Sequence, residues 1–139
     1  MNVRRYVIDT NVLFAGLYSS WGASHRILRM IDVGDVIPLL STTLLFEYEE
    51  VLRRNKGKLG LQVKDIDAIL DGLCLRGESR RVHFLWRPRL SDPKDDHVLE
   101  LAVAAGRAAI ITHNMKDFAN VENLGIRVMT PGTFIKEMK

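Results

Sequence analysis

The feature that most constrains the fold is a short apolar run near the start of the chain that ends in a carboxylate. Residues 6–8, Tyr-Val-Ile, are followed directly by Asp9. A β-branched and aromatic run of this kind is typical of a buried strand in a parallel sheet. Ligands of open α/β sheets bind at the edge where the strands end. Asp9 is therefore expected at that edge, with Thr10 or Asn11 capping the helix that follows.

Length and composition fit one α/β domain. The chain has 139 residues, of which 47% are hydrophobic and 27% are charged. This is enough for one core and too little for two ordinary domains, so we expect a single domain over residues 1–139. No apolar run approaches the roughly 20 residues of a membrane helix, and residues 1–5 lack a signal-peptide core. The single cysteine, Cys74, is expected in the core, which fits a cytoplasmic protein.

Further apolar runs predict alternating helices and strands. Pro38 is awkward inside a central strand, so the strand that contains it is expected to be short or to lie toward an edge. The expected elements are helices over residues 13–17, 24–34, 42–54, 63–74 and 97–105, a terminal helix from 131, strands over 36–40, 108–112 and 126–129, a strand or extended connection over 81–86, and a basic linker over 55–60.

Glu47 is the informative acid of the helix expected over residues 42–54. It shares a helical stripe with Leu44, Tyr48 and Val51, whereas the two glutamates that follow Tyr48 face elsewhere. A buried carboxylate needs a cation, a hydrogen-bond donor or a proton, because burying an unpaired charge is costly. Glu47 is therefore a candidate for a functional site.

Two more groups of acids flank later apolar runs. Residues 92–96 contain three aspartates at the start of a helix, which is more than capping requires. Asp95 is in register with Val98, and Asp96 is in register with Leu99, so periodicity leaves both open. Asp117 follows the apolar run at 108–112, as Asp9 follows the first strand.

Parallel strands joined by helices place these acids at one edge of the sheet. Several carboxylates at close range require a cation, and oxygen ligands without a Cys/His pattern suit Mg²⁺ or Mn²⁺. A carboxylate cluster that binds such an ion is suited to hydrolysing a phosphodiester bond. His97 and His113 are expected as hydrogen-bonding neighbours of the acids. Basic residues over 53–58 and 76–89 suit contacts with a phosphate backbone, although a solvated surface is the alternative for each group.

Taken in order, these segments resemble the PIN-domain family. The resemblance is carried by residues 7–12, 41–52, 92–102, 111–118 and 130–131. It implies a three-layer α/β/α sandwich with a mainly parallel central sheet and the activity of a Mg²⁺- or Mn²⁺-dependent endoribonuclease. In chains of this size it often implies the toxin of a toxin-antitoxin pair, with a small antitoxin protein as partner. A homodimer is expected on the same ground.

The resemblance also assigns roles by position. It implies that the catalytic residues are Asp9, Glu47, Asp95, Asp96 and Asp117, and that the metal ligands are Asp9, Glu47, Asp96 and Asp117. Four polar residues are expected to surround these acids, namely Asn11, Thr112, His113 and Asn114. Four basic residues are expected to contact RNA, namely Arg53, Arg54, Lys56 and Lys116.

Two departures from the family pattern leave choices open. The Asp-Pro-x-Asp pattern selects Asp95 as the third acid, whereas counting back from Thr112 selects Asp96. Asn114 stands where some relatives carry an acid, which gives more weight to Asp117. A phosphatase of the haloacid-dehalogenase type would need an acid where Asn11 stands. The remaining alternatives are an RNA-processing nuclease without an antitoxin, and a binding module that keeps the fold without cleaving.

Overall fold

The computed structural model describes residues 4–82, 96–119 and 121–138. Within them the chain forms an α/β fold around a five-stranded, all-parallel sheet in the order β3-β2-β1-β4-β5. The strands are β1 (Arg5–Ile8), β2 (Ile37–Leu40), β3 (Glu78–Ser79), β4 (Ala109–Ile111) and β5 (Val128–Met129). Two expectations, an extended segment over residues 83–86 and a functional Asp95, fall outside the described residues.

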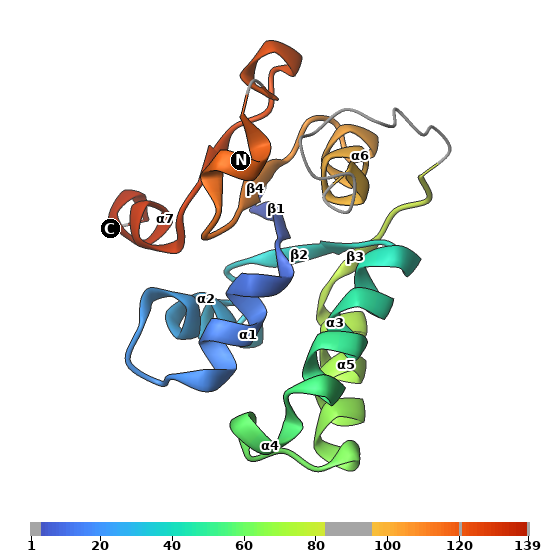
Figure 1. Ribbon diagram of the computed structural model, residues 1–139. Coiled ribbons are helices and arrows are strands. Elements are labelled where there is room, and N and C mark those ends of the chain that lie inside the picture. The colour runs from blue at the N-terminus through green and yellow to red at the C-terminus, as the bar shows by residue number, and fades with distance from the viewer. Residues whose placement is uncertain (1–3, 83–95, 120, 139) are drawn as a thin grey trace.

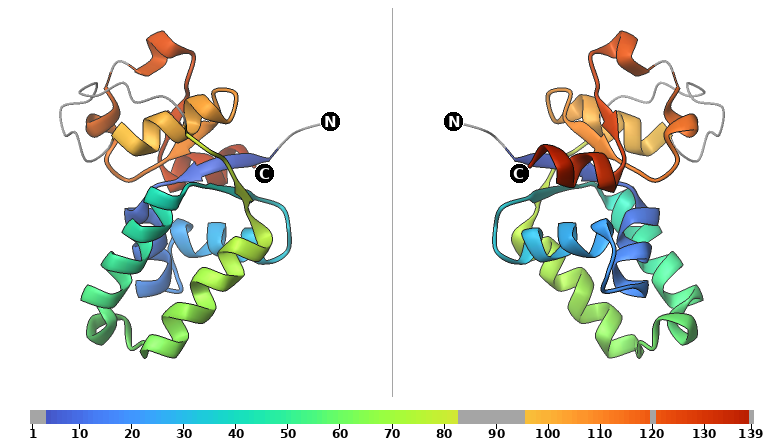
Figure 2. Two further views of the ribbon diagram at one scale, coloured as in Figure 1. Left: turned by 90° about the vertical axis from the view of Figure 1, so that its right-hand side faces the viewer. Right: turned by 90° about the vertical axis from the view of Figure 1, so that its left-hand side faces the viewer.

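Helices cover both faces of the sheet (Figures 1 and 2). The α6 helix lies on one face, and α1, α2, α3 and α5 lie on the other. The α-helices are α1 (Thr10–Tyr18), α2 (Ala23–Asp32), α3 (Thr42–Arg54), α4 (Lys56–Leu59), α5 (Val63–Arg76), α6 (Asp96–Ala104) and α7 (Pro131–Glu137), and two 3₁₀ helices are η2 (Met115–Phe118) and η3 (Val121–Leu124). The three-layer α/β/α prediction is confirmed.

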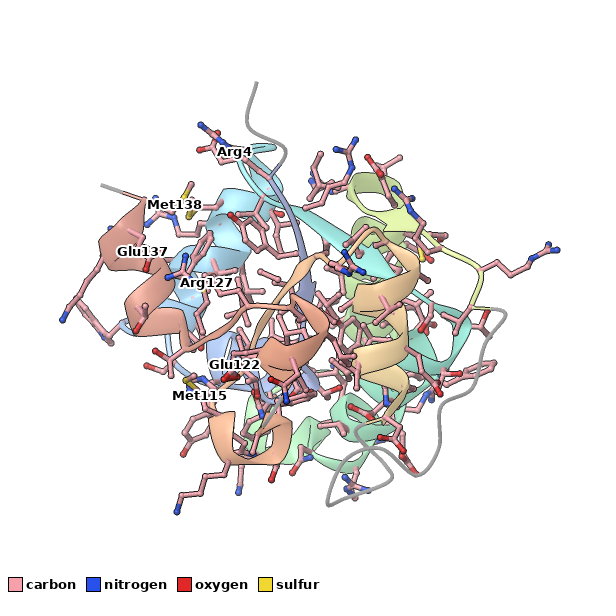
Figure 3. All side chains as sticks on the ribbon, turned by 90° about the horizontal axis from the view of Figure 1, so that it is seen from above. Arg4, Met115, Glu122, Arg127, Glu137 and Met138 are labelled. Carbon is pink, nitrogen blue, oxygen red and sulfur yellow. The ribbon has the colours of Figure 1, made fainter. Side chains whose placement is uncertain are left out.

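The terminal helix α7 is fixed to the body of the molecule at two places. The ring of Phe134 meets the ring of Tyr6 edge to face, with centroids 4.9 Å apart. Arg127, just before β5, donates to the Glu137 carboxylate, and both residues are labelled in Figure 3. None of the helices in the described parts of the chain combines the length and apolarity required to cross a membrane.

The strand that contains Pro38 is short, as one of the two predicted alternatives has it, but it is not an edge strand. The β2 strand lies between β1 and β3, and Pro38 pairs with Tyr6 of β1. The amide of Ile37 donates to Arg4 on the β1 side, so the nitrogen of Pro38 faces the β3 side. Pairing with β3 begins only at Leu39. The missing N–H of Pro38 therefore costs no ladder hydrogen bond.

Three other local predictions need correction. Asp9, rather than Thr10 or Asn11, is the N-cap of α1. The basic linker after α3 contains a helical turn, α4, which ends at Gly60 with a positive φ of 68°. Cys74 is exposed on α5 instead of buried.

Gly77 joins α5 to β3 where three segments crowd together. A Cβ at this position would lie 2.6 Å from the carbonyl oxygen of Pro38 and 2.8 Å from that of Leu73. Because backbone atoms cannot easily move aside, we expect Gly77→Ala to lower the free energy of unfolding by about 1–3 kcal/mol. Chemical denaturation measures this change.

Gly72→Ala is the matched control on the same helix. Its Cβ would meet only the flexible end of Arg76, at 3.5 Å. Since alanine is the better helix former, this variant is expected to gain roughly 0.5–1 kcal/mol. Equal effects of the two substitutions would contradict the crowding at Gly77.

Candidate active site

A pocket of about 390 Å³ lies where β1 and β4 end. The carboxylates of Asp9, Glu47 and Asp117 reach it from the tip of β1, from α3 and from η2. Among the described residues, its lining includes Asp9, Thr10, Asn11, Phe14, Glu47, Val51, Asn55, Asn114 and Asp117. Three of the predicted acids therefore share one pocket, although they come from distant parts of the chain.

Asp9 is held by donors on both carboxylate oxygens. Its Oδ1 accepts from the backbone amide of Thr10 at 2.9 Å, and its Oδ2 accepts from the Thr112 hydroxyl at 2.7 Å and from Asn11 Nδ2 at 3.3 Å. The residue is only 6% exposed. Burial raises the pKa of Asp9, and the charge of Glu47 raises it further, against the hydrogen bonds from Thr112 and Thr10.

Glu47 is half-buried and oriented by two side chains. His97 Nε2 donates to Oε1 at 2.7 Å, and the Thr10 hydroxyl donates to Oε2. Burial alone would raise the pKa of Glu47, but the bonds from His97 and Thr10 outweigh it and lower the pKa below its usual value. Glu47 is therefore ionised at neutral pH. It lies at the border of the buried stripe that contains Leu44 and Tyr48.

Tyr48 connects α3 to the end of β1. Its hydroxyl donates to the carbonyl oxygen of Ile8 at 2.5 Å, one residue before Asp9. Burial raises the pKa of Tyr48 well above its usual value, so the phenol remains a donor. Since Tyr48 follows Glu47 directly, this bond fixes the spacing between the two acids.

The tip of β4 supplies the other polar neighbours of Asp9. The Thr112 hydroxyl, which donates to Asp9, accepts from the amide of Asn114 at 3.1 Å. The amide of His113 donates to Asn11 Oδ1 at 3.1 Å. The imidazole of His113 instead lies 2.8 Å from the Ser24 hydroxyl of α2. The predicted neighbours Asn11 and Thr112 thus contact Asp9, Asn114 lines the pocket, and the His113 ring turns away.

Asp96 does not line this pocket. It is 1% exposed at the start of α6. Across residues 4–82, 96–119 and 121–138, no three His, Cys, Asp or Glu side chains form a group that could hold a metal ion. The predicted convergence of Asp9, Glu47, Asp96 and Asp117 on one ion is therefore not found among these residues.

The four predicted RNA-contacting residues are exposed and differ in their ion pairs and in their sequence neighbours. Arg53 is paired with Glu49 at 3.0 Å and with Asp67 at 3.7 Å. Arg54 and Lys56 are exposed on either side of Asn55, which lines the pocket. Lys116 is exposed in η2, next to Asp117. Arg54, Lys56 and Lys116 thus each adjoin a pocket-lining residue in the sequence, whereas Arg53 is engaged in two ion pairs.

Several residues of the site lie beyond what the sequence pattern indicates. The pattern identifies Thr10 only as a helix cap, and it assigns Tyr48 to core packing without its hydroxyl bond. It does not single out Phe14, although this residue lies three positions after Asn11 on the same helical face. Asn55 falls in the expected linker. The signal that could have identified Phe14 is its position on the same face of α1 as Asn11.

The donor set around Asp9 and Glu47 fits a divalent cation. Asp9 and Glu47 line one pocket and offer carboxylate oxygens, which are the ligands that Mg²⁺ takes in proteins. Mg²⁺ is commonly bound by one or two carboxylates and keeps several waters, so a group of three ligands is not required. Asp9 and Glu47 are the residues that would hold such an ion, and Asp117 lines the same pocket.

The fold and this pocket define a parallel α/β protein with an acidic site at the carboxyl edge of its sheet. The family model for the PIN domain matches residues 5–116. The chain therefore belongs to the PIN-domain family, as the sequence resemblance predicted. PIN domains are generally nucleases, which are hydrolases, and typically use divalent metals. No curated protein matches the chain.

Proposed function

We propose that this protein is a metal-dependent endoribonuclease that hydrolyses phosphodiester bonds of single-stranded or structured RNA. The observation that carries the proposal is the pair Asp9 and Glu47, each oriented by at least two hydrogen bonds at a pocket that Asp117 also lines. The family supports a nuclease, and the exposed basic residues that adjoin pocket residues in the sequence support a polyanionic substrate.

In this proposal the protein aligns the two carboxylates and keeps Glu47 ionised. Mg²⁺ or Mn²⁺, when bound, supplies positive charge to the phosphate and activates water for attack. Thr112 and the amide of Thr10 fix the rotamer of Asp9, while His97 and the Thr10 hydroxyl fix that of Glu47. Because these groups are placed before substrate arrives, little reorganisation is needed during the reaction.

The family resemblance extends the proposal to a toxin of a toxin-antitoxin pair, acting in the cytoplasm as a homodimer and neutralised by a small antitoxin protein. A nuclease of RNA processing, without an antitoxin, would use the same pocket. Both roles share the chemistry of Asp9 and Glu47, so one assay tests their common basis.

We expect the purified protein to cleave single-stranded RNA in the presence of Mn²⁺ or Mg²⁺. Chelation by EDTA should abolish cleavage because Asp9 and Glu47 themselves supply only negative charge, and excess Mn²⁺ should restore it. Separation of end-labelled RNA on denaturing gels measures the products. Cleavage that persists in EDTA, or intact RNA with every divalent ion, would contradict the proposal and favour a binding module.

A further inference from the structure

The first helix, α1, carries two aromatic rings that lead out of the acidic pocket. Phe14 and Tyr18 stand one helical turn apart, and their rings are stacked with centroids 5.8 Å apart and an interplanar angle of 10°. Phe14 lines the pocket together with Asp9 and Glu47. Tyr18 is 59% exposed. The stacked pair therefore connects the acidic pocket with the surface.

These rings do not belong to the hydrophobic core. The core side of α1 is formed by Val12 and Leu13, and neither Phe14 nor Tyr18 packs against the core cluster. Exposing aromatic rings beside a polar pocket contributes little to folding, because the apolar area stays in water. Exposed apolar surface at a pocket is often a binding surface.

Residues of α3 line the pocket together with the α1 ring of Phe14. The α1 helix runs from the tip of β1 alongside α3 (Figures 1 and 2). Val51 and Asn55 are among the lining residues on this side. Asn55 is flanked by the exposed cations Arg54 and Lys56. The pocket at α1 and α3 thus carries carboxylates and an aromatic ring, and two exposed cations adjoin its residue Asn55 in the sequence.

We propose that the Phe14–Tyr18 pair is a stacking site for an unpaired nucleobase of the RNA substrate. This inference rests on the proposed function and adds a substrate class to it. A base next to the phosphate bound near Asp9 and Glu47 stacks on the Phe14 ring, and the stacked Tyr18 ring supports Phe14 in this position. Bases inside a duplex are already stacked on each other, so only an unpaired base can use this face. The site therefore selects single-stranded RNA with little dependence on base identity.

A direct RNA-binding assay tests this stacking site independently of cleavage. In the Asp9→Asn background with Mg²⁺, a short single-stranded RNA that contains 2-aminopurine is titrated with protein. We expect binding to quench the fluorescence of the analogue as it stacks. Phe14→Leu and Tyr18→Leu should each raise the dissociation constant by about tenfold and reduce the quenching, since stacking contributes substantially per base.

Two controls separate stacking from general effects. Phe46→Leu removes an aromatic ring that is 65% exposed on α3 and does not line the pocket, so it should leave binding unchanged. Duplex RNA of the same sequence should bind the Asp9→Asn parent protein and both α1 variants with equal dissociation constants. Because Tyr18 is largely exposed, Tyr18→Leu is expected to fold, which circular dichroism and thermal melting verify.

The outcomes distinguish the two proposals. Equal dissociation constants for the parent protein and both α1 variants would overturn the stacking site and leave the nuclease proposal standing. An equal loss of affinity for duplex RNA would also overturn it. If the Asp9→Asn parent protein binds no single-stranded RNA, the stacking site is overturned, and the cleavage assay with the wild type decides the nuclease proposal. If the parent protein binds but the wild type never cleaves, the function is binding and the stacking site stands.

Discussion

Replacing Asp9 with asparagine is expected to reduce RNA cleavage by about a thousandfold while the protein still folds. The asparagine side chain retains an oxygen that can accept from the Thr10 amide, so the cap of α1 is preserved. It lacks the charge that would hold a divalent cation, whose contribution to a transition state is several kcal/mol. A loss of about 4 kcal/mol corresponds to about three orders of magnitude in rate. Initial rates of RNA cleavage in Mn²⁺ measure the effect.

The stability of the Asp9→Asn variant is expected to depend on pH differently from that of the wild type. Burial raises the pKa of Asp9 above its ordinary value of 3.8, so the folded protein holds this proton more tightly than the unfolded chain does. The wild type therefore loses stability as pH rises from the ordinary value through the raised pKa. The amide that replaces the carboxyl group does not titrate. In metal-free buffer the stability of the variant relative to wild type should increase with pH over this range.

Asp71→Asn is the matched control for Asp9→Asn. Asp71 is exposed on α5 and does not line the pocket. The same loss of one negative charge there should leave the cleavage rate within about twofold of wild type, because exposed charges are screened. Full activity of the Asp9 variant, or a comparable loss in the Asp71 variant, would remove Asp9 from the site.

The residues that sequence predicted well are those whose placement depends on local pattern. Asp9 follows a buried strand directly, and Glu47 shares a stripe with Leu44, so strand length and helical period were enough to bring both to the same edge. The order of the strands, β3-β2-β1-β4-β5, was not predicted from the sequence. Strand length and helical period report which face a residue lies on.

Sequence patterns do not report which neighbouring residue a side chain contacts. The His113 ring turns to Ser24 because α2 lies beside the tip of β4, a non-local contact. Asp96 shares a helical stripe with core residues, yet its position along α6 places it outside the pocket lining. The aromatic pair on α1 was missed for the opposite reason, since Phe14 and Tyr18 have apolar side chains that a pattern assigns to the core.

Glu47→Gln is expected to reduce cleavage by about a hundredfold, with a stability effect of opposite sign to that of Asp9→Asn. The hydrogen bonds from His97 and Thr10 lower the pKa of Glu47, so its ionised form stabilises the folded state. This contribution is present above the ordinary value of 4.5 and is lost as pH falls through the lowered pKa. Glutamine accepts these donors less strongly. The variant should melt below wild type at neutral pH and converge with it in acid.

Glu50→Gln provides the control on the same helix. Glu50 is exposed and does not line the pocket, so its charge can be removed without changing the surroundings of Asp9. We expect its cleavage rate and melting temperature to match those of wild type. If Glu50→Gln lost as much activity as Glu47→Gln, the effect would belong to the net charge of α3. If Glu47→Gln kept full activity, Asp9 and Asp117 would be left as the acids of the pocket, and a cation held between Asp9 and Glu47 would be excluded.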